Sequence, residues 1–135
     1  MDAEIQKLRS SCPINFALEL LGDKWTLLII RDLLFKEKTS FLEFSKSDEK
    51  ISTNILSDRL RKLEQHGFIS KSVSPNNKSK FEYSLELIGR DLLPVLLELF
   101  AWGAKHNPDL DFPTGFLEFY QKDKAQLIRL LSGES

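Results

Sequence analysis

The chain has 135 residues, 41% of them hydrophobic and 29% charged, and a formal net charge of −1. This composition predicts one folded domain with a terminal helical extension and excludes a disordered chain. Unbroken apolar runs such as residues 27–30 are too short to span a membrane, and the acidic N-terminus does not resemble a secretory signal. The single cysteine, Cys12, cannot form an internal disulfide and fits a reducing, cytoplasmic setting.

The charge is distributed unevenly along the chain. Residues 1–49 carry seven basic and nine acidic side chains, residues 50–80 carry seven and two, and residues 81–135 carry five and nine. Because salt screens charges beyond about 8–10 Å, this local balance governs contact with phosphates. The basic segment indicates either a nucleic-acid-binding surface or a merely solvated face, and charge alone does not separate the two.

The first 45 residues predict an arm and three helical segments. Residues 1–11 are expected to form a mobile arm or a short helix. A proline opens the next helix, over residues 13–21, where a missing N–H costs nothing. Asp23 is expected to cap a helix over residues 24–35, which is apolar on almost every side and therefore central. Residues 41–44 are expected to form a short helical segment with two core aromatics.

The helix that follows carries most of the functional information. Ser52 is a good N-cap, and Gly67 ends the helix. Leu56, Leu60 and Leu63 line one side at helical spacing and predict its buried face. The opposite side is polar and consists of Asn54, Ser57, Asp58, Arg61 and Gln65.

Two strands and more helices complete the chain. Residues 68–74 and 80–85 alternate apolar and polar side chains, and a turn over residues 75–79, with one proline and two asparagines, joins them. Helices are expected over about residues 87–105 and 114–131. The predicted fold class is mainly α with a small β-hairpin (α+β), in which a helix followed by a basic hairpin outlines a winged helix-turn-helix.

No catalytic or metal-binding constellation stands out in the sequence. His66 and His106 are isolated, and one cysteine with two scattered histidines does not make a metal site. The chain has no glycine-rich phosphate loop and no Gly-x-Ser-x-Gly motif. We therefore expect no enzyme, no cofactor and no bound metal.

The helix that begins at Ser52 has the features of a helix that enters the major groove of DNA. Such a helix needs short polar side chains at its N-terminal end and cations on its flanks. Hydroxyl and amide groups there can meet base edges or phosphates, and the helix N-terminus itself favours phosphate. The short polar residues in question are Ser52, Thr53, Asn54 and Ser57.

Five cations complete this predicted DNA-binding surface. Arg61 lies on the same face of the helix and can pair with guanine through two hydrogen bonds. Arg59 and Lys62 flank it and suit backbone phosphates. Lys78 and Lys80 lie on or beside the hairpin tip, from which they can reach a neighbouring minor groove or its phosphates.

Six separated motifs add a family resemblance. In their order and spacing they resemble the HxlR-type winged helix-turn-helix transcriptional regulators of bacteria, over about residues 12–103. The motifs are Cys12-Pro13-Ile14, residues 22–33, Phe41-Leu42-Glu43-Phe44, residues 51–69, Glu82-Tyr83-Ser84-Leu85 with Gly89-Arg90, and Trp102-Gly103.

The resemblance implies a domain organisation and a set of partners. Residues 1–11 would be an N-terminal arm, residues 12–105 the DNA-binding domain and residues 106–135 a C-terminal helical extension for dimerisation. The N-terminal and C-terminal helices would form the homodimer interface. The Ser52 helix would be the recognition helix, and residues 75–80 the wing.

Three departures from the family pattern concern operator sequence and affinity more than the fold. Thr39 and Ser40 stand where the family usually has basic residues, which removes a phosphate contact. Glu86 replaces the usual threonine cap after the second strand. The wing has fewer prolines than is typical, so a softer wing is expected.

Cys12 matches a position that senses oxidants or electrophiles in parts of this family. A thiolate there would be favoured by the N-terminus of the following helix, with Lys7 and Arg9 nearby. The alternative is an inert thiol. With no second cysteine, oxidation would have to join two protomers or cap the thiol with a small molecule.

Taken together, these features predict a transcriptional regulator that binds an inverted-repeat operator in double-stranded DNA as a homodimer, without membrane association. The alternative is a winged-helix protein–protein interaction module without DNA binding, which the acidic overall balance favours. The sequence leaves open the operator, the regulated genes, the direction of regulation and whether a small-molecule effector binds.

Overall fold

The computed structural model describes residues 8–133. The expected mainly α fold with a small β-hairpin is confirmed, and most of the expected arm over residues 1–11 lies outside the described part. The elements are, in chain order, α2 (Pro13–Leu21), α3 (Thr26–Phe35), α4 (Phe41–Ser45), α5 (Thr53–Gln65), β1 (Ile69–Val73), β2 (Phe81–Leu85), α6 (Leu87–Arg90), α7 (Leu93–His106), α8 (Phe116–Lys122) and α9 (Lys124–Leu131).

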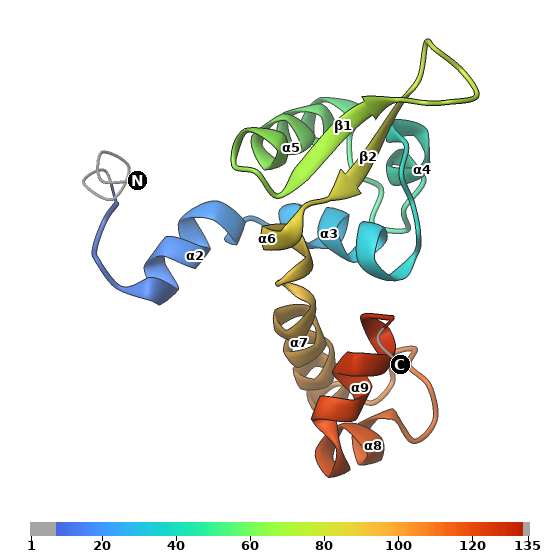
Figure 1. The fold of residues 1–135 in the computed structure, drawn as a ribbon. Helices are drawn as coiled ribbons and strands as arrows, with labels where there is room; N and C mark the ends of the chain where they lie inside the picture. The colour runs from blue at the N-terminus through green and yellow to red at the C-terminus, as the bar shows by residue number, and fades with distance from the viewer. Residues whose placement is uncertain (1–7, 134–135) are drawn as a thin grey trace.

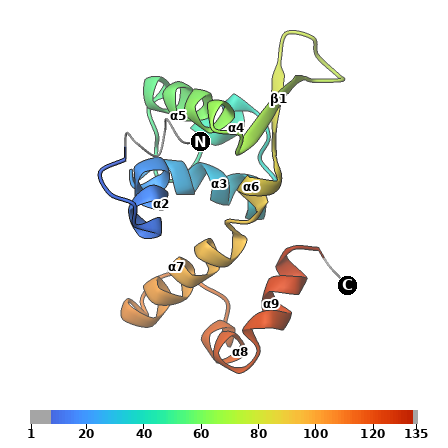
Figure 2. The ribbon, with the colours of Figure 1, turned by 60° about the vertical axis from the view of Figure 1, so that its left-hand side comes forward.

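The elements form one packed unit with two appendages. Helices α3, α4 and α5 lie together with the hairpin of β1 and β2, whose loop projects away from them (Figure 1). Helix α2 extends to one side, and α7 leads away from the unit towards α8 and α9 (Figure 2). Within residues 8–133, every helix is too short or too polar to cross a membrane.

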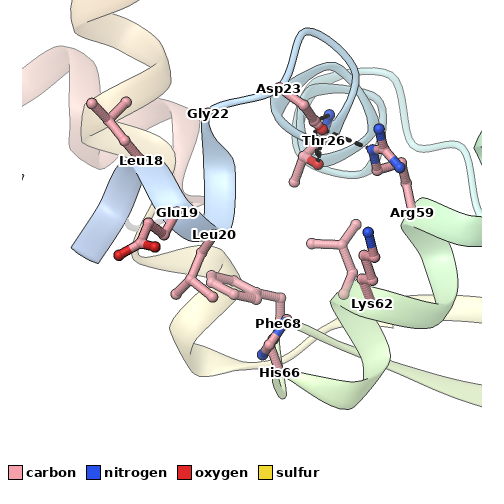
Figure 3. Close-up of a pocket in the computed structure, with 11 residues that line it drawn as sticks. Leu18, Glu19, Leu20, Gly22, Asp23, Thr26, Arg59, Lys62, His66 and Phe68 are labelled. Atoms are coloured by element: carbon pink, nitrogen blue, oxygen red, sulfur yellow. Dashed lines mark hydrogen bonds and ion pairs between the residues drawn. The ribbon is translucent and has the colours of Figure 1, made fainter. Parts of the chain in front are cut away.

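Asp23 caps α3, and it also joins this helix to α5. Its carboxylate accepts hydrogen bonds from the backbone N–H of Thr26 at 2.9 Å and of Trp25 at 3.3 Å. The helix therefore begins at Thr26, slightly later than the sequence predicts. Arg59 of α5 donates from Nε to the same carboxylate at 2.8 Å (Figure 3). One acidic side chain thus fixes the start of α3 and its position against α5.

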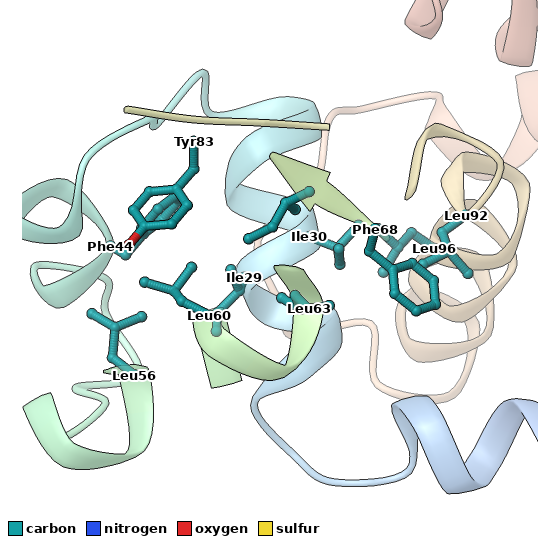
Figure 4. Packing of buried hydrophobic residues seen from close by; sticks show 11 residues of the cluster. Ile29, Ile30, Phe44, Leu56, Leu60, Leu63, Phe68, Tyr83, Leu92 and Leu96 are labelled. Carbon is teal, nitrogen blue, oxygen red and sulfur yellow. The ribbon is translucent and has the colours of Figure 1, made fainter. Parts of the chain in front are cut away.

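The core lies where α3, α5, the hairpin and the start of α7 meet (Figure 4). All three leucines of the predicted inner face of α5 belong to it, so that expectation is confirmed. Each large apolar side chain removed from water contributes about 1.5–3 kcal/mol. The buried members are Ile29, Ile30, Phe44, Leu56, Leu60, Leu63, Phe68, Ile69, Tyr83, Leu92 and Leu96.

Polar side chains tie the middle of α3 to the chain just ahead of α5. Asp32 is buried, and its carboxylate accepts a hydrogen bond of 2.5 Å from Ser47 Oγ. Arg31 donates hydrogen bonds of 2.7 and 2.8 Å to Glu49, which lower the pKa of that carboxyl to about 2. Because Glu49 closely precedes Ser52, these contacts help to set where α5 begins.

Two of the expected helices are divided in the structure. The helix expected over residues 87–105 is α6 followed by α7, because Pro94 lacks an N–H and fits only the first turn of a new helix. The helix expected over residues 114–131 is α8 followed by α9. Asp123 separates these two, and its carboxylate accepts a hydrogen bond from the N–H of Gln126 at 3.1 Å, which caps α9.

Gly89 of α6 packs against backbone so closely that no side chain fits. A Cβ at this position would lie 2.4 Å from the carbonyl oxygen of Phe68. Gly89→Ala should therefore lower the free energy of unfolding by about 1–3 kcal/mol in urea denaturation. Gly103→Ala in α7 is the control, because a Cβ there meets nothing within 4 Å. Equal losses of stability in both variants would contradict the close approach.

Candidate nucleic-acid interface

Helix α5 presents a polar face to solvent because its apolar face is sealed in the core. Leu56, Leu60 and Leu63 are 0%, 2% and 3% exposed. Ser52 is the N-cap of α5 and has an extended backbone. Its Oγ accepts a hydrogen bond from the N–H of Ile55 at 3.3 Å. The predicted contacts at the N-terminal end of α5 are all exposed, namely Ser52, Thr53, Asn54 and Ser57.

Arg61 and Lys62 are also exposed, and both are paired with Asp58. The Arg61 guanidinium lies 2.7 Å from Asp58 Oδ1, and Lys62 Nζ lies 3.3 Å from Oδ2. Desolvation acts to raise the pKa of Asp58, but hydrogen bonds from Lys62 and Arg61 outweigh it and lower this pKa. Asp58 thus partly neutralises the predicted DNA-binding surface of its own helix. Its position on the polar side of the helix did not by itself indicate this role.

Arg59 lies apart from the exposed face of α5. Its side chain is 23% exposed, against 59% for Arg61, and its guanidinium donates to Asp23 and Asp58 at 2.8 and 2.5 Å. Asp23 and Arg59 border a small cavity of about 160 Å³ between α2, α3 and α5 (Figure 3). The structure therefore turns the Arg59 guanidinium towards Asp23, and its phosphate contact stays a prediction.

The hairpin loop is ordered by its own hydrogen bonds. The N–H of Ser74 donates to the carbonyl of Lys80 at 2.8 Å, and Lys80 donates back to the carbonyl of Asn77 at 3.0 Å. The Asn77 side chain accepts from the N–H and Oγ of Ser79 at 3.0 and 2.7 Å. Lys78 and Lys80 are exposed on this loop. Asn77 thus supplies turn contacts within the loop, and the softer wing stays a prediction.

Thr39 and Ser40, which replace the usual basic residues, organise the start of α4. Ser40 Oγ accepts from the N–H of Glu43, and the Glu43 carboxylate accepts from the N–H groups of Thr39 and Ser40. The bonds from Thr39 and Ser40 lower the pKa of Glu43. The backbone carbonyl of Thr39 also accepts a hydrogen bond of 2.8 Å from the backbone N–H of Tyr83 in β2, which fixes the hairpin to this loop. The Ser-x-x-Glu spacing was a readable signal for this capping box.

Cys12 is an exposed free thiol that precedes the first turn of α2. Its backbone is extended, and its side chain makes no capping hydrogen bond. Arg9, which was expected to support a thiolate, directs its guanidinium towards Glu19 at 3.8 Å. Lys7 lies outside the described residues. Cys12 is therefore accessible, and of its two expected cations the described residues include only Arg9, which faces Glu19.

Within the described part of the chain, no three side chains of the kinds that ligate metals come together. His66 lies at the C-cap of α5, and the His106 ring lies 4.7 Å from the ring of Trp102. Glu86 is the N-cap of α6 and makes no side-chain capping hydrogen bond.

Comparison with known proteins agrees with this geometry. A family model described as HxlR-like helix-turn-helix matches residues 20–111. YdeP of Bacillus subtilis, described as an uncharacterized HTH-type transcriptional regulator, is 37% identical over 100 residues, which cover 74% of this chain and 77% of YdeP.

Two solved structures are similar to this chain. The crystal structure of PA1607 has 37% identity and a TM-score of 0.69, and the match covers 78% of this chain and 73% of that one. The redox regulator HypR in its oxidized form has 33% identity and a TM-score of 0.63, and the match covers 73% of this chain and 100% of HypR. The expected winged helix-turn-helix is confirmed.

The Asp23–Arg59 pair gives a prediction about stability and pH. Burial acts to raise the pKa of Asp23, but hydrogen bonds from Thr26 and Arg59 outweigh it and lower this pKa. The stabilisation is therefore complete above the unfolded value, near 4, and is lost as the pH falls through the lower folded value. Asp23→Asn keeps an acceptor for Thr26 but removes the charge opposite Arg59, so it should cost about 1 kcal/mol at pH 7.

Thermal unfolding of both proteins at pH 7 and pH 3 measures this difference, which should shrink at pH 3. Asp109→Asn is the matched control, because Asp109 is exposed and makes no ion pair within residues 8–133. A difference that grows on acidification would contradict the assigned role of Asp23.

Proposed function

Because the chain belongs to the HxlR-like helix-turn-helix family of transcriptional regulators, we propose that it binds double-stranded DNA as a homodimer on an inverted-repeat operator. The observation that carries this proposal is the outward face of α5, where short polar groups and cations stand on a helix anchored by buried leucines. The major groove of B-DNA is about 12 Å wide and admits one such helix.

In the proposed complex, the N-terminal end of α5 enters the groove. Ser52, Thr53 and Asn54 offer hydroxyl and amide groups to base edges and phosphates, and the free N–H groups of the first turn favour a phosphate. Ser57 lies one turn further along the same face. Arg61 exchanges its contact with Asp58 for two hydrogen bonds to a guanine.

The flanking cations divide into two roles. Lys62, Lys78 and Lys80 are exposed and suit phosphate contacts, which fix register without reading sequence. Arg59 is assigned a positioning role, because its guanidinium is held between Asp23 and Asp58. It orients α5 against α3 and so aims the exposed face.

The homodimer is proposed to form through α2 and the C-terminal helices. Helix α2 buries none of its residues, and Ile14 and Leu18 are 70% and 54% exposed. Trp102 on α7 is 67% exposed. These exposed apolar side chains are available for an interface that would remove them from water. A twofold axis between such helices would place two recognition helices about 34 Å apart, in successive major grooves.

A response to thiol-reactive signals through Cys12 is a separate part of the proposal. Cys12 is exposed, and the similar protein HypR is described as a redox regulator with an oxidized form. In this chain, oxidation can join Cys12 of two protomers or attach a small thiol to it. Either product changes the start of α2 and, with it, the proposed dimer interface.

Arg61→Ala tests the recognition surface. The variant should bind an operator selected from random duplexes more weakly by about 1–3 kcal/mol, because one guanine contact is lost. Fluorescence anisotropy titration measures this loss, and Lys24→Ala, an exposed cation ahead of α3, is the control with unchanged affinity. Unaltered binding by Arg61→Ala would remove Arg61 from the site. If the wild type binds no duplex in a salt-dependent manner, the alternative of a protein–protein module is favoured.

Cys12→Ser tests the response to oxidants. Treatment with diamide and glutathione should change operator affinity in the wild type and leave the variant unchanged, because only a thiol forms the mixed disulfide. Mass spectrometry identifies the product as a glutathione adduct or a disulfide-linked dimer. Equal responses of the two proteins would reject Cys12 as the sensor.

A further inference from the structure

Helices α8 and α9 lie entirely beyond residues 20–111, the part matched by the family model. Together with α3 and α7 they line an open hollow of about 840 Å³, which we call the C-terminal hollow. Its walls are mainly hydrocarbon and include Leu27, Leu99, Phe100, Phe119, Leu127 and Leu130. Ligand pockets of proteins typically enclose about 300–1,000 Å³ and have largely apolar walls.

The wall formed by α8 and α9 is held in place by contacts within the chain. The ring of Phe116 meets that of Phe100 edge-on at 4.8 Å. Tyr120 donates a hydrogen bond to Glu98 of α7, and Lys124 Nζ lies 2.7 Å from the same carboxylate. The hollow is therefore a feature that the chain builds for itself, and not a gap beside a loosely placed helix.

The hollow has one cation from the middle of α3 and one from its C-cap. Arg31 and Lys36 both contribute to its lining. Arg31 is already bound to Glu49 and Asp32. Lys36 is exposed and, within residues 8–133, its ammonium makes no hydrogen bond or ion pair. The site thus combines a large hydrocarbon interior with a positive charge that is available at one end.

We propose that the C-terminal hollow binds an amphipathic carboxylate, with its hydrocarbon among the leucines and phenylalanines and its carboxylate at Lys36. The size and apolar walls fit a medium-length alkyl chain, and the cation complements one negative charge. The partner of the proposed homodimer, which would also use α2 and the C-terminal helices, is the competing occupant of the hollow, because α2 exposes apolar residues.

Arg31 connects a carboxylate bound in the hollow to the start of α5. Arg31 lines the hollow and forms the paired hydrogen bonds with Glu49, a few residues ahead of the cap at Ser52. A carboxylate near Lys36 competes with Glu49 for the Arg31 guanidinium and loosens the segment that leads into α5. We therefore expect the ligand to weaken operator binding, and this step alone rests on the proposed function.

Decanoate is the probe, and two substitutions on α7 form a matched pair. Leu99 and Val95 are 51% and 44% exposed on the same helix, but only Leu99 lines the hollow. Calorimetry below the micelle concentration should show decanoate binding to the wild type and to Val95→Gln. Leu99→Gln should weaken it about tenfold, because apolar contact is lost. Lys36→Gln should weaken the binding of decanoate but leave the binding of uncharged decanol unaffected.

Several outcomes would overturn the inference. These are no binding to the wild type, equal affinities of Leu99→Gln and Val95→Gln, or a Lys36→Gln change that affects decanol equally. Sedimentation of the same proteins tests the competing occupant: if only Leu99→Gln is monomeric, a second copy fills the hollow. Because these measurements contain no DNA, their failure leaves the proposed DNA binding untouched. Binding without any change in operator affinity would overturn the route through Arg31 alone.

Discussion

The burial of one face of α5 is the constraint on which the remaining structure depends. Leu56, Leu60 and Leu63 lie in the core beside α3 and the hairpin, and each contributes about 1.5–3 kcal/mol by leaving water. Successive helical residues are about 100° apart, so a register shift of one residue would turn a leucine outward. The same shift would turn Arg61 away from solvent. The buried leucine face of α5 therefore decides which of its side chains are exposed for recognition.

Burial of apolar side chains does not by itself fix the orientation of α5. Two hydrogen-bonded ion pairs supply this restraint. Arg59 reaches Asp23 at the start of α3, and Arg31 reaches Glu49 ahead of α5. The first contact acts at the start of α3 and the second near its middle, so together they restrain both the tilt of α5 and its starting point. Their partners are charged and only partly exposed, so their geometry is restricted more than that of surface pairs.

The sequence predicts the local elements well because their signals are local. The cap at Ser52, the leucine spacing and the alternation in the hairpin each lie within a few residues, and α5 and the hairpin formed as predicted. The inward use of Arg59 was not predictable in the same way, because Asp23 lies 36 positions away and only the fold brings the two together. The division of the last helix was missed because Asp123 competes with the helix through a short-range cap that helical periodicity does not show.

The pairing of cations within α5 bears on how the proposed complex gains specificity. Any duplex offers phosphates, but Arg61 and Lys62 already hold Asp58, and the chain as a whole carries a net charge of −1. A phosphate must therefore compete with an internal carboxylate, which weakens non-specific attraction. A guanine offers Arg61 two acceptors that other bases do not present in the same arrangement, whereas the phosphates are the same at every site. In the proposed complex, Asp58 thus raises the contrast between a correct and an incorrect site without itself touching DNA.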